Sequence, residues 1–171
     1  MNNGFVIFEI ETSGLNPTHD EIIRINAIRI VNKKITDRFS SLVRSEKPLS
    51  EKNEKLTGIK AHELEDQEDI SIVLRRFVEW YSDDHWVTNN SKFTTSFIIN
   101  AANKHSIFID RPVIDIANLV KLLSPNIIES TSYGIYESMF INKKLPDFLD
   151  RCYEIFIHEI KTLESRSISI Y

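Results

Sequence analysis

The feature that most constrains this chain is an apolar run near the N-terminus that ends in two glutamates and a glycine-containing turn, Phe5-Val6-Ile7-Phe8-Glu9-Ile10-Glu11-Thr12-Ser13-Gly14-Leu15. The run predicts a β-strand. On a strand, Glu9 and Glu11 lie on one face, with Phe8 and Ile10 on the other. A buried carboxylate without a partner is costly. The pair therefore either holds a hard cation or lies at the solvent-facing edge of an ordinary strand.

The bulk composition predicts one globular domain. The chain has 171 residues, of which 42% are hydrophobic and 27% charged, which is enough for a sizeable core. We expect a domain over residues 1–165 and a short tail over 166–171. No apolar stretch approaches the ~20 residues that cross a membrane, and no signal peptide is visible. The single cysteine, Cys152, excludes an internal disulfide, so we predict a cytoplasmic protein without membrane contact.

Charge is distributed unevenly along the chain. The net charge of −4 argues against a protein that coats nucleic acid by charge alone. Residues 24–60 nevertheless carry ten Lys and Arg against four Asp and Glu, and residues 61–84 carry two against eight. The basic segment is either a phosphate-facing surface or an ordinary solvated face.

The periodicity predicts strands first and then strands alternating with helices, which is typical of a single α/β domain. Residues 32–34 form a polar turn, so the second and third strands form a hairpin. The predicted strands are 5–11, 22–31, 35–43 and 85–88, and the predicted helices cover 50–58, 70–81, about 93–102, 115–123 and 130–163, the last broken near Pro146.

This order of elements and its motifs resemble the DEDD-type 3′–5′ exonuclease family, which contains proofreading subunits and oligoribonucleases. The stretch from Phe8 to Pro17 is similar to the family pattern F-D-I-E-T-T-G-L-x-P. The other matching pieces are Asp20-Glu21-Ile22-Ile23-Arg24-Ile25, Asp37-Arg38-Phe39, Leu56-Thr57-Gly58-Ile59 and Asp115 with Leu119. The resemblance runs from about Phe5 to Phe156. It implies a ribonuclease-H-like α/β fold, a mixed five-stranded sheet flanked by helices.

The resemblance also implies a metal-dependent active site. Family members place two divalent cations, usually Mg²⁺ or Mn²⁺, among four carboxylates, where they activate the attacking hydroxide and support the leaving oxygen. Glu9 and Glu11 match the first two carboxylates, which makes them the candidate catalytic residues and metal ligands, although Glu9 stands where the family has Asp. Residues Thr12, Ser13, Gly14 and Leu15 match the segment that lies against the terminal nucleotide.

The second family motif, H-N-x-x-F-D, aligns with residues 89–94. Asn90 and Phe93 are retained and are candidate nucleic-acid-binding residues. Asn89 and Thr94 are degenerate positions, and Thr94 replaces the third carboxylate with a neutral hydroxyl. The alternative interpretation of this segment is a strand-to-helix turn with an asparagine cap.

The third family motif, H-x4-D, supplies the fourth carboxylate and the histidine that acts as general base. Asp147 and Asp150 are alternative candidates for this carboxylate. The residues five positions before them are Asn142 and Leu145, which are further degenerate positions, and none of the five histidines aligns with the general base. Loss of a general base alone typically costs ~10²–10⁴-fold in rate.

Three functions follow from these matches. The first is a catalytically impaired exonuclease-fold protein that binds a single-stranded nucleic-acid end in the old cleft, with one Mg²⁺ or Mn²⁺ ion or none. The second is an active metal-dependent exonuclease in which Glu9 and Glu11 are joined by Asp147 or Asp150, with Asp115 as a further ligand. The third is a protein-interaction module without a nucleic-acid role, which docks a protein partner through its helical faces and the acidic segment 61–84.

Overall fold

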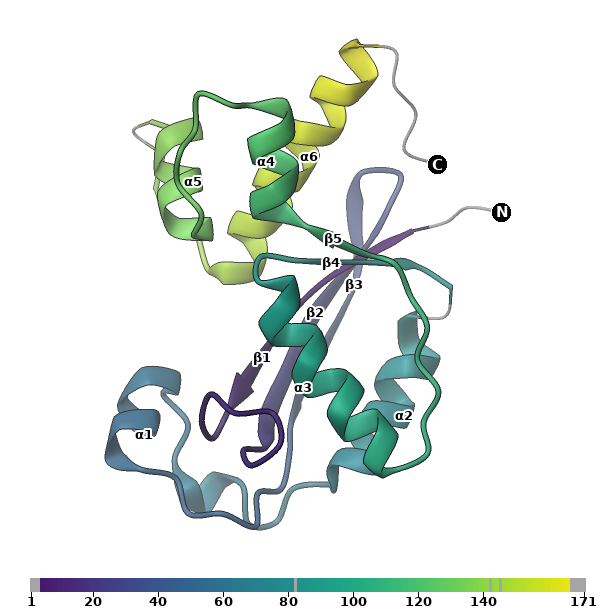
Figure 1. The fold of residues 1–171 in the computed structure, drawn as a ribbon, viewed down its shortest axis with the longest axis vertical. Helices are drawn as coiled ribbons and strands as arrows, with labels where there is room; N and C mark the ends of the chain where they lie inside the picture. The colour runs from purple at the N-terminus through teal and green to yellow at the C-terminus, as the bar shows by residue number, and fades with distance from the viewer. Residues whose placement is uncertain (1–3, 82, 142, 145, 167–171) are drawn as a thin grey trace.

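A computed structural model describes residues 4–81, 83–141, 143–144 and 146–166. Its centre is a five-stranded sheet in the order β3-β2-β1-β4-β5 (Figure 1). The strands β1, β2 and β3 pair antiparallel, whereas β4 and β5 add in parallel beside β1. The strands are β1 (Phe5–Thr12), β2 (Ile22–Val31), β3 (Lys34–Leu42), β4 (His85–Thr88) and β5 (Val113–Asp115). The predicted mixed five-stranded sheet is confirmed.

A tight turn joins β2 to β3. Asn32 and Lys33 both adopt positive φ angles, 51° and 61°, as the central residues of a type I′ hairpin turn require. Asparagine tolerates this conformation better than most residues. The predicted hairpin is therefore confirmed, with its turn at Asn32 and Lys33.

Helices cover both faces of the sheet. They are α1 (Glu51–Thr57), α2 (Ile70–Tyr81), α3 (Ser91–Lys104), α4 (Ile116–Leu123), α5 (Ser132–Met139) and α6 (Phe148–Ser165), with a 3₁₀ turn at Ala61–Glu63. α1 is bounded by Ser50, whose hydroxyl accepts the Asn53 N–H at 3.1 Å, and by Gly58 at φ 72°. Both are standard helix caps.

One face of the sheet packs against α2 and α3. The cluster includes the even-numbered β1 residues, their neighbours on β2, β3 and β4, and aromatic and aliphatic residues of the two helices: Val6, Phe8, Ile25, Ala27, Phe39, Val73, Leu74, Phe77, Tyr81, Trp86, Phe97, Ile98 and Ala102. Phe8 and Trp86 pack edge to face with ring centroids 4.8 Å apart, a favoured aromatic geometry.

The other face packs against α4, α5 and α6, which lie together in Figure 1. This second cluster includes Phe5, Ile7, Ile28, Ile30, Val87, Ile116, Val120, Ile135, Tyr136, Cys152, Ile155, Phe156 and Ile160. The Cys152 side chain is fully buried and unpaired, and burial raises the pKa of its thiol far above the ordinary value. Cys152 is therefore a core residue.

Most predicted boundaries agree with the structure to within a few residues. β5 was not predicted as a separate strand, because Asp110-Arg111-Pro112 interrupts the apolar run before it. The predicted break near Pro146 separates α5 from α6. In the part of the chain that is described, no helix combines the length and apolar character that spanning a bilayer requires. Most of the predicted tail, residues 167–171, lies outside the described residues.

Candidate active site

Glu9 and Glu11 lie on the sheet face that α6 covers, next to two polar residues of β2. The strand register sets Glu9 opposite Asn26 and Glu11 opposite Arg24. The Asn26 amide donates to Glu9 Oε1 at 3.3 Å, and Arg24 Nη2 donates to Glu11 Oε1 at 3.2 Å. Each glutamate of the predicted pair therefore has its own donor on the neighbouring strand.

Burial dominates the electrostatics of this pair. It raises the pKa of Glu9 and of Glu11 above the ordinary carboxylate range, because desolvation disfavours the charged form. Arg24 opposes the increase in both pKa values, and the Asn26 hydrogen bond opposes it at Glu9. The negative charges of Glu11 and Asp147 raise the pKa of Glu9 further.

The two alternative aspartates of the third motif have different partners. Asp147 is the N-cap of α6, where its Oδ1 accepts the Asp150 N–H at 2.9 Å. Its negative charge is the smallest of the contributions that raise the pKa of Glu9. Asp150 instead forms an ion pair with Arg38 of β3 at 2.9 Å. Asn142 and Leu145, the predicted degenerate positions, lie outside the described residues.

The second motif has a structural role in α3. Asn90 is the N-cap and accepts the Phe93 N–H at 3.4 Å, and the Phe93 ring packs 4.9 Å from Phe97. Thr94 is 4% exposed, with its hydroxyl 3.4 Å from that of Thr88. Asn89 Oδ1 is buried without a hydrogen bond in the described structure. The asparagine-cap alternative therefore describes Asn90 correctly.

The loop after β1 is held closed by its own side chains. Thr12 Oγ1 donates to the Gly14 carbonyl at 2.5 Å, and Ser13 Oγ accepts the Glu21 N–H at 2.9 Å. A Cβ at Gly14 would lie 2.3 Å from the Asp20 carboxylate, so a larger residue there would displace the side chain that accepts the Asn16 N–H. The Leu15 side chain is left 82% exposed, an unusual position for a leucine held in a fixed loop.

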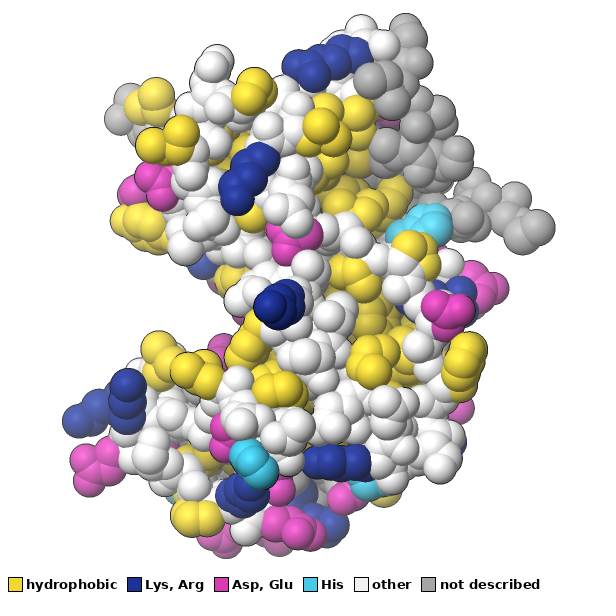
Figure 2. All heavy atoms as spheres, viewed as in Figure 1, with side chains coloured by type: hydrophobic (Ala, Val, Ile, Leu, Met, Phe, Trp, Pro, Cys, Tyr) yellow, Lys and Arg dark blue, Asp and Glu magenta, His cyan; other side chains and the backbone are white. Residues whose placement is uncertain are grey.

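α1 is attached to this loop. The Asn53 amide on α1 donates to the main-chain oxygens of Thr12 and Ser13. Leu56 on the same helix is 78% exposed. Figure 2 shows the molecule hollowed between the region of α1 and the region of α4, α5 and α6. In Figure 1 the loop lies beside α1, and β1 ends next to it.

The donor set does not fit a two-metal centre. Among the described residues, no three His, Cys, Asp or Glu side chains are grouped so as to hold a metal ion. Position 94 offers a buried hydroxyl instead of a carboxylate, and Glu11 is already paired with Arg24. Asp115, the further ligand considered above, accepts the Ser91 and Asn118 N–H groups at 2.9 and 3.1 Å, so its two oxygens stabilise helix starts.

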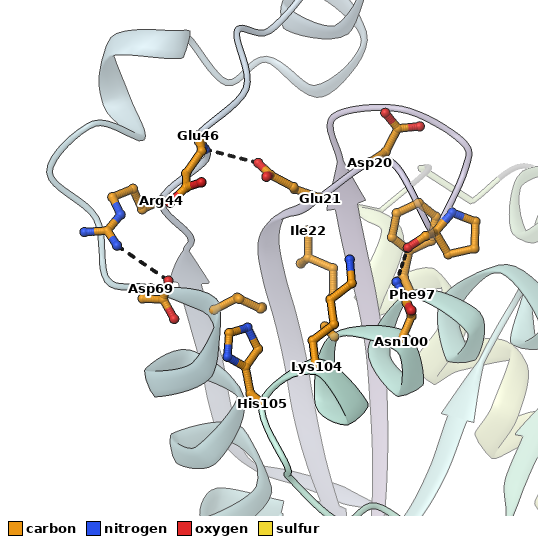
Figure 3. A pocket seen from close by; sticks show the side chains of 13 residues that line it. Asp20, Glu21, Ile22, Arg44, Glu46, Asp69, Phe97, Asn100, Lys104 and His105 are labelled. Atoms are coloured by element: carbon orange, nitrogen blue, oxygen red, sulfur yellow. Dashed lines mark hydrogen bonds and ion pairs between the residues drawn. The ribbon is translucent and has the colours of Figure 1, made fainter.

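Figure 3 shows a separate pocket of about 200 Å³. It is formed by the β1–β2 loop, the segment after β3 and the start of α2, with α3 opposite. Its lining combines apolar side chains such as Ile22 and Phe97 with charged groups of both signs. Glu9, Glu11 and Asp147 are not part of this lining.

Sequence reasoning missed Arg24 and Asn26 as site residues. The alternation of β2 places both on one face of that strand, which was the available signal. Their position opposite the glutamates depends on the register between β1 and β2. That register is set across the nine-residue loop between these strands, and no tight-turn motif in the loop identifies it.

Comparisons with known proteins agree on one family. The RNase_T family model, described as Exonuclease, matches residues 6–146. The chain is 40% identical over 123 residues to the PolC-type DNA polymerase III of Caldanaerobacter subterraneus subsp. tengcongensis and 36% identical over 124 residues to that of Bacillus subtilis. These matches cover 72% and 71% of this chain but 9% of each relative.

Solved structures show the same fold. Exonuclease X in complex with 5′ overhanging duplex DNA aligns with a TM-score of 0.66 at 19% identity, over 96% of this chain and 94% of that one. The nuclease domain of 3′hExo, a DEDDh family member bound to rAMP, aligns with a TM-score of 0.78 at 15% identity, over 94% and 92% of the two chains.

Proposed function

Because this chain belongs to the DEDD-type 3′–5′ exonuclease family, we propose that it binds a single-stranded nucleic-acid end beside Glu9 and Glu11 and cleaves that end weakly or not at all. The observation that carries the proposal is that one carboxylate of the site is paired with an arginine and another is replaced. Glu11 is paired with Arg24, and the position of the third carboxylate is a buried threonine. In the family these positions hold two metal ions. Two-metal catalysis requires both ions, because one stabilises the attacking oxygen and the other the leaving oxygen.

Binding is supported by the exposed part of the site. The closed loop from Thr12 to Leu15 presents a leucine that is 82% exposed, and Leu56 on the attached helix α1 is 78% exposed. Exposed apolar side chains are suited to contact an unstacked base. Of the two alternative aspartates, Asp147 is the one we assign to the site, since Asp150 is paired with Arg38. A single domain over residues 1–165 and a cytoplasmic location stay predictions.

The proposal is tested with a labelled single-stranded oligonucleotide and Mn²⁺. The wild-type chain is compared with a Glu9→Ala/Glu11→Ala double variant for binding by fluorescence anisotropy and for shortening on denaturing gels. We expect binding without efficient shortening. Metal-dependent shortening that disappears in the double variant would establish an active exonuclease, and absence of binding would favour the protein-interaction module.

A further inference from the structure

The positively charged Arg24 side chain lies at the Glu9 and Glu11 pair. Arg24 Nη2 lies 3.2 Å from Glu11 Oε1, and the two side chains are 28% and 27% exposed. A pair at this depth is screened less by salt than a surface pair. Arg24 also lowers the pKa of Glu9, so one guanidinium acts on both carboxylates.

Glu9 has a second, neutral donor that is fixed in orientation. Ser40 Oγ donates to Asn26 Oδ1 at 2.7 Å, which directs the Asn26 NH₂ group toward Glu9 at 3.3 Å. These two hydrogen bonds connect three neighbouring strands, because Glu9, Asn26 and Ser40 are partners in the strand register. Both glutamates therefore satisfy part of their hydrogen-bonding capacity from β2.

We propose that the Arg24 guanidinium takes the place of a divalent cation at this carboxylate pair, lowering the metal affinity of the site and presenting its remaining donors to a phosphate of the bound nucleic acid. The phosphate contact rests on the proposed function, whereas the effect on metal affinity does not. A divalent ion approaching Glu9 and Glu11 meets the positive charge of Arg24 and must compete with it for Glu11.

The donor inventory of Arg24 supports the phosphate contact. A guanidinium carries five N–H donors, and the hydrogen bond to Glu11 uses one that is on Nη2. Nε is enclosed by the protein, so the donors left for a phosphate are the two on Nη1 and the second one on Nη2. Arginine bonds carboxylate and phosphate oxygens through the same planar fork. One group can thus bridge Glu11 and a phosphate.

Metal affinity is measured by electron paramagnetic resonance of free Mn²⁺ titrated with the full chain. Arg24→Gln is expected to bind Mn²⁺ about 10–100-fold more tightly than the wild type, the size of effect that neighbours of metal ligands produce. The matched control is Arg38→Gln, which removes the same charge from β3, where Arg38 pairs with Asp150, and is expected to bind Mn²⁺ as the wild type does. Unchanged affinity in Arg24→Gln would overturn the proposal.

Wild-type and Arg24→Lys measurements keep the proposal testable if Arg24→Gln does not fold. Low-micromolar Mn²⁺ binding by the wild type would overturn it. Arg24→Lys keeps the charge and is expected to keep weak metal binding, and tightening in this variant would also overturn it.

A second arm separates this inference from the proposed function. Binding of the labelled oligonucleotide is measured in EDTA, where we expect the wild type and Arg38→Gln to bind and Arg24→Gln to bind several-fold more weakly. Equal binding by Arg24→Gln would overturn the phosphate contact. Failure of the wild type to bind would refute the proposed function, while the Mn²⁺ titration would still decide whether Arg24 opposes metal binding.

Discussion

Replacing Glu9 with glutamine should stabilise the protein at neutral pH. The substitution keeps the side-chain size and an acceptor for the Asn26 amide, and it removes a half-buried charge. At a strand rise of about 3.3 Å per residue, the Glu9 and Glu11 carboxylates are roughly 7 Å apart, where two like charges repel by about 2.4 kcal/mol at an effective dielectric constant of 20. Arg24 lies at a similar diagonal distance and offsets most of this repulsion.

The destabilisation that Arg24 does not offset comes from the desolvation of Glu9 and from its repulsion by Asp147. We expect a gain of about 1 kcal/mol, within the ~0.5–2 kcal/mol typical of single stabilising substitutions. For a chain of this size that corresponds to about 2–4 °C in melting temperature.

The pH dependence gives the sharper test. Since the folded-state pKa of Glu9 is raised, the native state binds the proton more tightly, and the wild type loses stability as pH rises from about 4.3, the unfolded value, through the folded pKa. The gain of Glu9→Gln should be absent at pH 4 and complete above the folded pKa. A lower melting temperature than wild type at pH 7, or the same difference at both pH values, would refute the reasoning.

Glu54→Gln is a control of opposite sign. Glu54 accepts the Ala61 N–H at 3.0 Å and the Lys60 ammonium at 3.1 Å, and these contacts lower its pKa. Its ionised form therefore stabilises the native state above the unfolded pKa, and this stabilisation is lost as pH falls through the folded pKa. The variant should melt below the wild type at pH 7 and approach it in acid.

Three further substitutions test separate parts of the structure. Asp84→Ala should lower the free energy of unfolding in urea by about 3 kcal/mol or more, because it leaves Arg29 and the Gly4 N–H without their buried partner; a loss under about 1 kcal/mol would contradict this. Leu15→Ala should leave stability within ~0.5 kcal/mol and weaken oligonucleotide binding several-fold in anisotropy titrations, and unchanged binding would count against the loop as a contact. Thr94→Asp should lower the melting temperature by calorimetry, since it buries a charge at a 4% exposed position, and a melting temperature equal to wild type would show that this position is more open than the structure indicates.

The fold was predictable because its signals are local. The alternation of β2, the turn at Asn32 and the amphipathic stripe of α2 each identify an element without reference to the rest of the chain. The short strand β5 was missed for the same reason: its three residues follow a proline, and it is a strand through its pairing with β4.

The site was predictable only in part, because its chemistry depends on register. The residues before and after Glu9 identify β1, but the partnership of Glu11 with Arg24 requires the pairing of β1 with β2. The choice between Asp147 and Asp150 likewise depends on the position of α6 over the sheet, because this position lets Arg38 form an ion pair with Asp150.

The two hydrophobic clusters on opposite faces of the sheet have a consequence for evolution. The cluster on the α6 side takes Phe5 and Ile7 from β1 and Ile28 and Ile30 from β2, whereas the polar rows around Glu9 and Glu11 continue the same strand faces and belong to neither cluster. Substitutions in these rows can alter ionic chemistry while the architecture persists. A lineage can therefore drift out of catalysis, and return to it, by exchanging a few side chains on an unchanged scaffold.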